Sequence, residues 1–221
     1  MEWLKDVSIL QDADVSYLDE VLLKEKGGFM KMLPASFYEG INRNDLMIWA
    51  NKSGRYGFPT VELIEWLKAM IGDRMAIEVG AGHGDLGHHL GVIQTDSYMQ
   101  TRPEIQAYYV ALGQSPIVPP EEVFQYDAVD AVKGLKPKVV IASWLTQLVV
   151  PEECETGTQG SVYGADEVEI IKSVDCYIHI GNDNSHSKKK ALELPHTKHY
   201  FPWLVSRGKD PSKNVIYVWG E

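Results

Sequence analysis

The chain has 221 residues, of which 44% are hydrophobic, enough for one α/β domain with a modest extension. Its formal net charge of −10 argues against a protein that binds nucleic acid through a generally basic surface. The N-terminal residues show no secretion signal, and the longest apolar stretch, residues 139–150, falls short of the roughly 20 residues of a membrane span. We therefore expect a cytoplasmic protein without membrane association, whose acidic surface suits a neutral or cationic small ligand.

Residues 1–57 differ in character from the residues that follow. Residues 16–26 are predicted to form a short amphipathic helix that ends at two glycines. Residues 28–51 are rich in methionine, aromatic residues and turn formers, and residues 44–50 predict a second short helix. We interpret residues 1–57 as an N-terminal helical extension with little core of its own, and residues 58–221 as the main domain.

The main domain begins with a loop and a clear helix. Residues 53–60 lead into a helix over 61–71, whose apolar residues recur at helical spacing and whose N-cap is Thr60. A strand follows almost at once, so this loop should lie near the end of that strand. We expect Arg55 to anchor the loop and Tyr56 to contact a bound molecule.

A glycine-rich turn joins the first strand to the next helix. The apolar run 75–79 fits one buried strand, Gly80, Gly82 and Gly84 follow at every second position, and residues 85–90 can form a short helix. Glycine lets the backbone take a positive φ and lets a ligand approach without meeting a Cβ atom. The free N–H groups of the helix start then face the ligand. The pattern predicts a nucleotide-type site.

Two nucleotide motifs compete at this turn. The dinucleotide pattern G-x-G-x-x-G fits residues 82–87, but its first glycine lies two positions beyond the turn and no acidic residue follows at the expected distance. The second pattern, E-x-G-x-G-x-G over residues 78–84, places Glu78 inside the strand end. A further strand over 91–96 then ends in Asp96, whose carboxylate can accept hydrogen bonds from both hydroxyls of a ribose.

The second pattern, together with Asp96, resembles class I S-adenosylmethionine-dependent methyltransferases. In that family the strand-end acid holds the ribose hydroxyls, and Glu78 would lie near the methionine part of the cofactor. The residues after the acid often lie beside the adenine, so Tyr98 or Met99 either packs on its face or belongs to the core. Extra N-terminal segments often cover the substrate pocket in this family, which makes a cover over the pocket and an ordinary packing extension equal alternatives for residues 1–57.

Two more strands continue the resemblance. A helix is predicted over 103–112, and a third strand over 123–127 ends in Asp127, which either accepts the adenine amino group or caps the helix over 128–133. The very apolar strand 138–143 reads as a central parallel strand. The resemblance implies the following cofactor-binding residues: Glu78, Gly80, Ala81, Gly82, Gly84, Asp96, Ser97, Tyr126, Asp127, Ala128 and Ser143.

Residues just past the fourth strand form the floor of the methyl-transfer site in the family, which makes Ser143 and Trp144 candidates for contact with the methionine part and the substrate. The sequence motifs of the enzymes that methylate nucleic-acid amino groups or cytosine C5 are absent, which lowers the expectation of a nucleic-acid substrate. No catalytic base is selected by spacing. The candidate catalytic residues are Ser143, Trp144, Tyr56 and His179.

The C-terminal third completes the predicted sheet. A long polar connection over 146–163 precedes a helix over 165–172 and a fifth strand over 174–180. Residues 200–205 and 214–219 predict a terminal antiparallel pair. The expected fold is therefore a Rossmann-like, mostly parallel seven-stranded sheet with helices on both faces, an antiparallel last strand and the N-terminal helical extension.

No metal site is expected from the histidines and cysteines. His83, His88 and His89 cluster on the glycine turn and its helix without a partner at zinc spacing. His179 and His186 lie on or just past the fifth strand with Asp183, and one of these three could act as a base. The two cysteines, Cys154 and Cys176, read as free thiols.

The expected activity is methyl transfer from S-adenosylmethionine to a small-molecule nucleophile, or to a polypeptide. The alternatives are an NAD-dependent oxidoreductase and a non-catalytic protein that keeps the fold as a binding module. The methyl acceptor, the oligomeric state and the need for a base are not fixed by the sequence.

Overall fold

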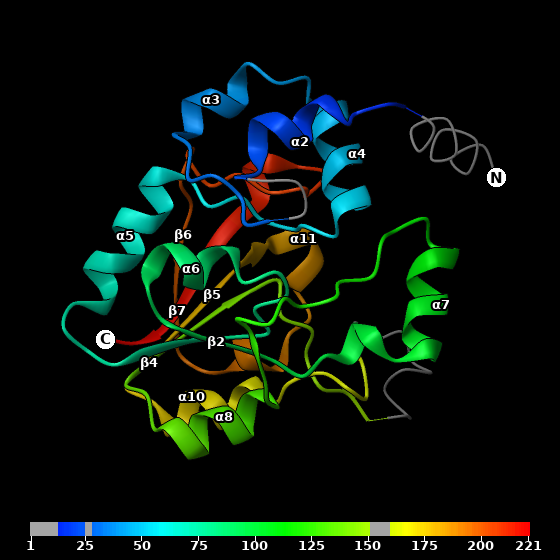
Figure 1. Ribbon diagram of the computed structural model, residues 1–221. Helices are drawn as coiled ribbons and strands as arrows, with labels where there is room; N and C mark the ends of the chain where they lie inside the picture. The colour runs from blue at the N-terminus through cyan, green and yellow to red at the C-terminus, as the bar shows by residue number, and fades with distance from the viewer. Residues whose placement is uncertain (1–12, 25–27, 151–159) are drawn as a thin grey trace.

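The computed structural model describes residues 13–24, 28–150 and 160–221, and shows a Rossmann-like α/β fold (Figure 1). Its seven-stranded sheet has the order β3-β2-β1-β4-β5-β7-β6, in which β7 runs antiparallel to both neighbours and the other pairs are parallel. The expected fold class is confirmed. The strands are β1 (Ala76–Val79), β2 (Ile93–Asp96), β3 (Phe124–Gln125), β4 (Val139–Ser143), β5 (Cys176–Asn182), β6 (Thr197–His199) and β7 (Asn214–Gly220).

Helices cover both faces of the sheet, because alternate strand residues point to opposite faces and both sets are apolar. Val139 and Ile141 of β4 pack toward α5 and α6, while Val140 and Ala142 pack toward α8 and α10. The helices are α2 (Tyr17–Leu22), α3 (Ala35–Glu39), α4 (Arg43–Ser53), α5 (Val61–Ile71), α6 (Asp85–Leu90), α7 (Pro103–Ala111), α8 (Ala128–Leu135), α10 (Glu167–Ser173) and α11 (Asp183–His186), with 3₁₀ turns η1 (Met99–Thr101), η2 (Lys190–Glu193) and η3 (Pro211–Lys213).

The N-terminal region has a hydrophobic core, contrary to the expectation from sequence. Its helices α2, α3 and α4 enclose a cluster that includes Leu18, Met30, Trp49 and Phe58, all of which are less than 3% exposed. These apolar residues are spread over short helices and a loop, so no single periodic stretch revealed them. The helix predicted over 44–50 is longer at both ends, because the Asn42 side chain caps it and Gly54 ends it in a left-handed conformation.

The N-terminal region is fastened to the main domain at several points. The Arg43 guanidinium donates to the Ser206 carbonyl at 2.8 Å, and the Met30 N–H donates to Asp85 Oδ1 of α6 at 2.7 Å. Arg55 forms an ion pair with Asp85 at 3.0 Å and donates to the Gly28 carbonyl, so it anchors the loop as expected.

Two predicted strands differ from those observed. The strand that forms the terminal antiparallel pair with β7 is β6, and not the predicted residues 200–205, which form a loop. Phe201 and Trp203 stack on one another at 4.2 Å and pack against the core, and Pro202 between them has no N–H group to donate to a neighbouring strand. The third strand is reduced to two exposed residues, Phe124 and Gln125, at the edge of the sheet.

Helix α7 lies at the periphery of the molecule (Figure 1). None of its residues is buried, and Tyr108 and Val110 are 60% and 65% exposed. No described helix is long and apolar enough to cross a membrane. Cys176 is a buried free thiol, whereas Cys154 and part of the connection predicted over 146–163 lie outside the described residues.

Candidate functional site

A cavity of about 340 Å³ crosses the carboxyl ends of β2, β1, β4 and β5. From β1 the sheet continues through β2 and β3 to one side and through β4 and β5 to the other, so the order of the strands reverses between β1 and β4. Open α/β sheets bind their ligands at such a switch point. One part of the cavity, which we call the β2 end, is lined by Asp96, Ser97, Met99, Gln100, Asp127 and Ala128. The other part, the β5 end, is lined by Tyr56, Ser143, Trp144, Thr146, Gln147, Ser185, His186 and Lys189.

Asp96 ends β2 and its carboxylate is fixed by two backbone groups. Oδ2 accepts from the Gly82 N–H at 2.9 Å, and Oδ1 accepts from the Tyr98 N–H at 2.7 Å. Burial raises the pKa of Asp96, and these two hydrogen bonds oppose that shift. An ionised carboxylate offers about four acceptor positions. About two acceptor positions of the Asp96 carboxylate therefore remain available to hydroxyl groups of a ligand.

The glycine turn forms the cavity wall between β1 and β2. Gly80 and Gly82 have φ of +60° and +56° and line the cavity. A Cβ atom on Gly80 would collide with the Leu145 side chain, which also lines the cavity. Gly84, in contrast, does not line the cavity: it takes φ of +75° as the N-cap of α6 and leaves room for the Gln94 side chain.

Glu78 lies apart from this cavity. It is 2% exposed, and its Oε2 accepts from the Gly87 N–H of α6 at 2.8 Å. Burial raises the pKa of Glu78 to about 8, and nearby Asp85 and Asp96 act in the same direction. With Ala81 it lines a second, much smaller cavity of about 70 Å³ between β1 and the loop that follows α4.

Other predicted cofactor residues are divided between the cavity and its surroundings. Asp127 lines the β2 end and also caps α8, since its Oδ1 accepts from the Val129 N–H at 2.9 Å. Tyr126 is 53% exposed and lies outside the main cavity. Met99 lines the β2 end, whereas Tyr98 is directed away: its hydroxyl donates to the Val123 carbonyl at 2.6 Å.

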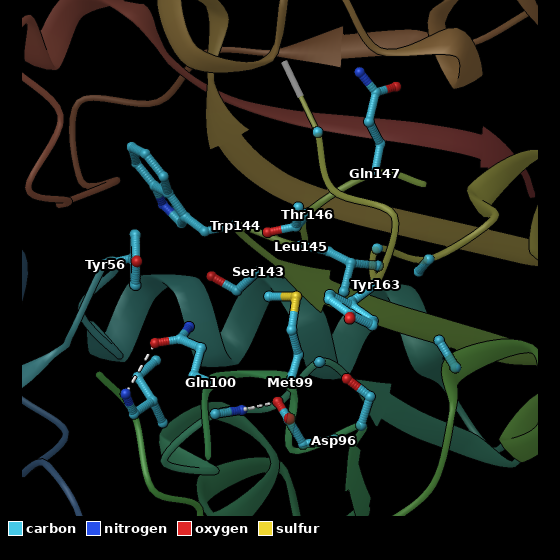
Figure 2. A pocket seen from close by; sticks show the side chains of 18 of the residues that line it. Tyr56, Asp96, Met99, Gln100, Ser143, Trp144, Leu145, Thr146, Gln147 and Tyr163 are labelled. Carbon is cyan, nitrogen blue, oxygen red and sulfur yellow. Dashed lines mark hydrogen bonds between the residues drawn. The ribbon is translucent and has the colours of Figure 1, made fainter. Parts of the chain in front are cut away.

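Of the candidate catalytic residues, three meet at the β5 end (Figure 2). Ser143 ends β4, Trp144 follows it, and the rings of Trp144 and Tyr56 lie 5.6 Å apart. Asp96 lies on the opposite side of the cavity from this pair. Of the described residues of the N-terminal extension, Tyr56 is the one that lines the main cavity.

The fourth candidate, His179, is completely buried behind the cavity. Its Nδ1 lies 3.2 Å from Glu167 Oε1, and its ring packs against His186 at a centroid distance of 4.8 Å. Burial lowers the pKa of His179 to about 4, and Lys189 contributes in the same direction. Burial likewise lowers the pKa of His186, so both rings are neutral at pH 7.

A buried ion pair that the sequence did not reveal lies beneath the β5 end. Lys189 and Glu167 contact each other, and their side chains are 3% and 2% exposed. Burial opposes ionisation of Glu167, but the Lys189 ammonium and His179 lower its pKa, and the Tyr177 hydroxyl donates to the same carboxylate at 2.7 Å. Lys189 stands in a run of three lysines that reads as a solvent-exposed segment, so no signal distinguished it.

Lys189 also joins the segments that follow β4 and β5. Its Nζ donates to the Leu145 carbonyl at 2.7 Å. Gln147 reinforces the joint, because its Nε2 donates to the Lys188 carbonyl at 3.2 Å and its Oε1 accepts from the Lys190 N–H at 3.0 Å. The floor of the cavity at the β5 end is thus held by side chains from both segments.

Three further histidines attach the N-terminal region to the glycine turn and to α6. His83 Nε2 lies 2.9 Å from the Ser53 carbonyl, and His89 Nε2 lies 2.8 Å from the Met30 carbonyl. His88 stacks on Phe29 at 4.0 Å. In the described part of the chain, no group of three or more histidine, cysteine or acidic side chains is arranged to hold a metal ion.

No family model and no curated protein matches the sequence. Among solved structures, protein 1320 of Thermoplasma acidophilum is 15% identical, with a TM-score of 0.33, and the match covers 71% of this chain and 83% of that one. SMU.776, a candidate methyltransferase complexed with SAH, is 10% identical with a TM-score of 0.35, and the match covers 68% of this chain and 47% of that one. PH1948 of Pyrococcus horikoshii, a candidate RNA methyltransferase, is 13% identical with a TM-score of 0.32, and the match covers 71% of this chain and 77% of that one. These likenesses concern the fold alone.

Proposed function

We propose that the protein is an S-adenosylmethionine-dependent methyltransferase that acts on a small-molecule nucleophile, with a polypeptide side chain as the second class of acceptor. The observation that carries the proposal is the position of the Asp96 carboxylate. Its carboxylate ends β2, is fixed by the Gly82 N–H of the glycine turn, and lines the same cavity as Ser143 at the end of β4. A ribose hydroxyl pair beside Asp96 would place the remainder of the cofactor across the switch point of the sheet.

The residues of the cavity fit such a cofactor. Asp96 retains acceptor positions for the ribose, and Asp127 together with Met99 lines the β2 end, where the adenine would lie. Gly80 and Gly82 present backbone without side chains along the path from the ribose to β4. S-adenosylmethionine would supply a methyl group that its sulfonium already activates, so the protein has mainly to align the acceptor and exclude water.

Isothermal titration calorimetry with S-adenosylmethionine, S-adenosylhomocysteine and NAD tests the proposal. We expect micromolar binding of both adenosyl compounds and none of NAD. Selective binding of NAD would favour the dinucleotide interpretation of the glycine turn. Silence with all three ligands would favour a non-catalytic binding module.

Asp96→Ala is the sharpest variant for the same titration. Loss of the two ribose hydrogen bonds should weaken binding of S-adenosylhomocysteine at least tenfold, since hydrogen bonds to a charged group contribute about 1.5–3 kcal/mol each. Asp73→Ala is the matched control, because Asp73 is an exposed acid that precedes β1 and so lies near the amino end of that strand, whereas the cavity lies at the carboxyl ends. Equal affinity in both variants would remove Asp96 from the site.

A further inference from the structure

Three segments that lie far apart in the sequence meet beside Tyr56. The loop after α4 pairs with the loop after β6, because the Phe58 N–H donates to the Val205 carbonyl at 3.1 Å and the Arg207 N–H donates to the Tyr56 carbonyl at 2.9 Å. The Arg207 guanidinium lies over the Tyr56 ring, with its Cζ 3.4 Å from the ring centroid. Its Nη2 donates to Oε1 of Gln114, which follows α7, at 2.9 Å. The backbone pairing therefore holds a cation against a residue that lines the cavity.

Arg207 has no acidic partner in the described part of the chain. Two arginines of the N-terminal region differ from it: Arg55 forms an ion pair with Asp85 at 3.0 Å, and Arg43 donates to two backbone carbonyls. Burial lowers the pKa of Arg207, and interactions with two tyrosine side chains oppose that shift. A partly buried guanidinium has lost hydration that a bound anion would replace.

Arg207 also keeps hydrogen-bond donors that a ligand can reach. A guanidinium carries several N–H groups, and this one donates to Gln114 and interacts with the Tyr56 side chain. None of its nitrogens is both enclosed and without a partner, in contrast to Nε of Arg43. The N–H groups that Arg207 leaves unused are therefore open to solvent.

Two tyrosines connect this guanidinium to the cavity. Tyr56 and Tyr109 both line the cavity, and their side chains interact with one another and with Arg207. We call these three residues the Arg207 corner. Hydroxyl and guanidinium groups are the donors that recognise carboxylates in proteins, and the planar guanidinium can bind both oxygens of one carboxylate.

The charges around the cavity favour an anion at this corner. The protein carries a net charge of −10, so an anionic ligand needs a local cation. The acidic side chains that line the described part of the cavity lie at the β2 end, namely Asp96 and Asp127. Figure 2 shows Asp96 and Tyr56 on opposite sides of the cavity. The lysine that lines the β5 end is already paired with Glu167, which leaves Arg207 as the uncompensated cation on this side among the described residues.

From these observations we propose that the Arg207 corner binds a carboxylate group of the methyl acceptor, so that the acceptor is a small molecule with a negative charge. The word acceptor rests on the proposed function, whereas the affinity for a carboxylate is a property of the corner. Arg207 is thus a residue that determines substrate specificity and takes no part in the transfer itself. The cofactor carries a carboxylate of its own, and the experiment below separates the two sources.

A titration with benzoate and benzamide tests the proposal. The two probes have the same shape and differ in charge, and their flat rings suit a wall that contains the rings of Tyr56 and Trp144. In protein saturated with S-adenosylhomocysteine, benzoate should bind about tenfold more tightly than benzamide and should shift the Arg207 Nε–H signal in ¹H–¹⁵N spectra. Arg207→Gln identifies that signal by its loss.

Substitutions at two arginines complete the titration. Arg207→Gln should bind benzoate about tenfold more weakly and benzamide as the wild type does, because it removes a charge-assisted hydrogen bond. Arg207→Lys should retain part of the preference for benzoate, since it keeps the charge without the planar fork. Arg102→Gln is the matched control: Arg102 also stacks on a tyrosine of the cavity, with its Cζ 4.4 Å from the Tyr163 ring centroid, and this variant should bind benzoate like the wild type.

The cofactor carboxylate is tested with S-adenosylhomocysteine and 5′-methylthioadenosine, which lacks the amino-acid part. Arg207→Gln should bind both compounds as the wild type does. Weaker binding of S-adenosylhomocysteine alone would assign Arg207 to the cofactor and overturn the proposal.

Three further results would overturn it: benzoate that binds no more tightly than benzamide or not at all at its solubility limit, an Arg207 signal that stays in place while benzoate binds, or an equal loss of benzoate affinity in Arg102→Gln. Should Arg207→Gln fail to fold, backbone assignment identifies the signal, and the wild-type titration with Arg207→Lys still decides. Failure of the proposed function is seen separately, as the absence of S-adenosylhomocysteine binding, and the benzoate titration is then made without it.

Discussion

Glu78 should make the stability of this protein fall as the pH rises from about 5 to 8. Burial raises the pKa of its carboxyl group from 4.5 to about 8. Between these values the folded protein keeps a proton that the unfolded chain has released, so unfolding becomes more favourable with increasing pH. The stabilisation is fully present below the unfolded-state pKa and is lost as pH approaches the folded-state pKa.

The size of the effect follows from the shift. Each pH unit between the two pKa values changes the free energy of unfolding by up to about 1.4 kcal/mol, so the whole interval amounts to about 4–5 kcal/mol at most. Glu78→Gln should abolish this slope, because glutamine resembles the protonated acid and its side-chain oxygen can still accept from the Gly87 N–H.

Urea unfolding at pH 5, 6, 7 and 8 measures the slope for the wild type and for Glu78→Gln. The two proteins should be similarly stable at pH 5, and the variant should gain about 1 kcal/mol relative to the wild type with each further unit. Glu65→Gln, which changes an exposed acid on α5, is the control and should follow the wild type. A constant difference between wild type and Glu78→Gln across this range would refute the assignment of a proton to Glu78.

Two further predictions concern the cavity and its support. Lys189→Met should cost about 3–5 kcal/mol in urea unfolding, because it leaves Glu167 buried and unpaired, and adding Glu167→Leu should restore most of that loss; no recovery would contradict the pairing. Gly80→Ala should lose S-adenosylhomocysteine binding, because its Cβ clashes with the side chain of Leu145, which lines the cavity and would have to move. Gly91→Ala, at φ of +71° in open space, should cost about 1–2 kcal/mol of stability and keep binding; equal affinities in the two glycine variants would exclude this steric effect.

The elements that could be predicted from sequence are those whose signal is local. The strand, the three glycines and Asp96 lie within a short stretch, and the structure brings Gly80, Gly82 and Asp96 to one cavity. The same holds for α5, where Thr60 caps the first turn, the apolar spacing runs through the helix, and Gly72 follows its last residue.

What could not be predicted depends on contacts between distant segments. The pair of Glu167 and Lys189 joins α10 to the segment after β5, and neither residue lies in a motif. Phe201 and Trp203 have the composition of a strand but are used to cover the core, which moved the observed β6 to the preceding residues. Burial of Glu78 under α6 is likewise a tertiary effect, since the motif gives its position along the strand but not the direction of its side chain.

The exposure of α7 has a consequence for how ligands reach the cavity. Tyr109 of α7 lines the cavity and its side chain interacts with that of Tyr56, yet no residue of the helix is buried, so detachment of α7 would lose little apolar contact. In native-state hydrogen exchange, the α7 amides should exchange through local opening at a free energy far below that of global unfolding, while the β4 and β5 amides exchange only globally. If the α7 amides exchange in this way, this part of the cavity wall opens while the sheet and both of its cores remain folded, whereas exchange as slow as that of β4 and β5 would show that α7 is held as firmly as the sheet.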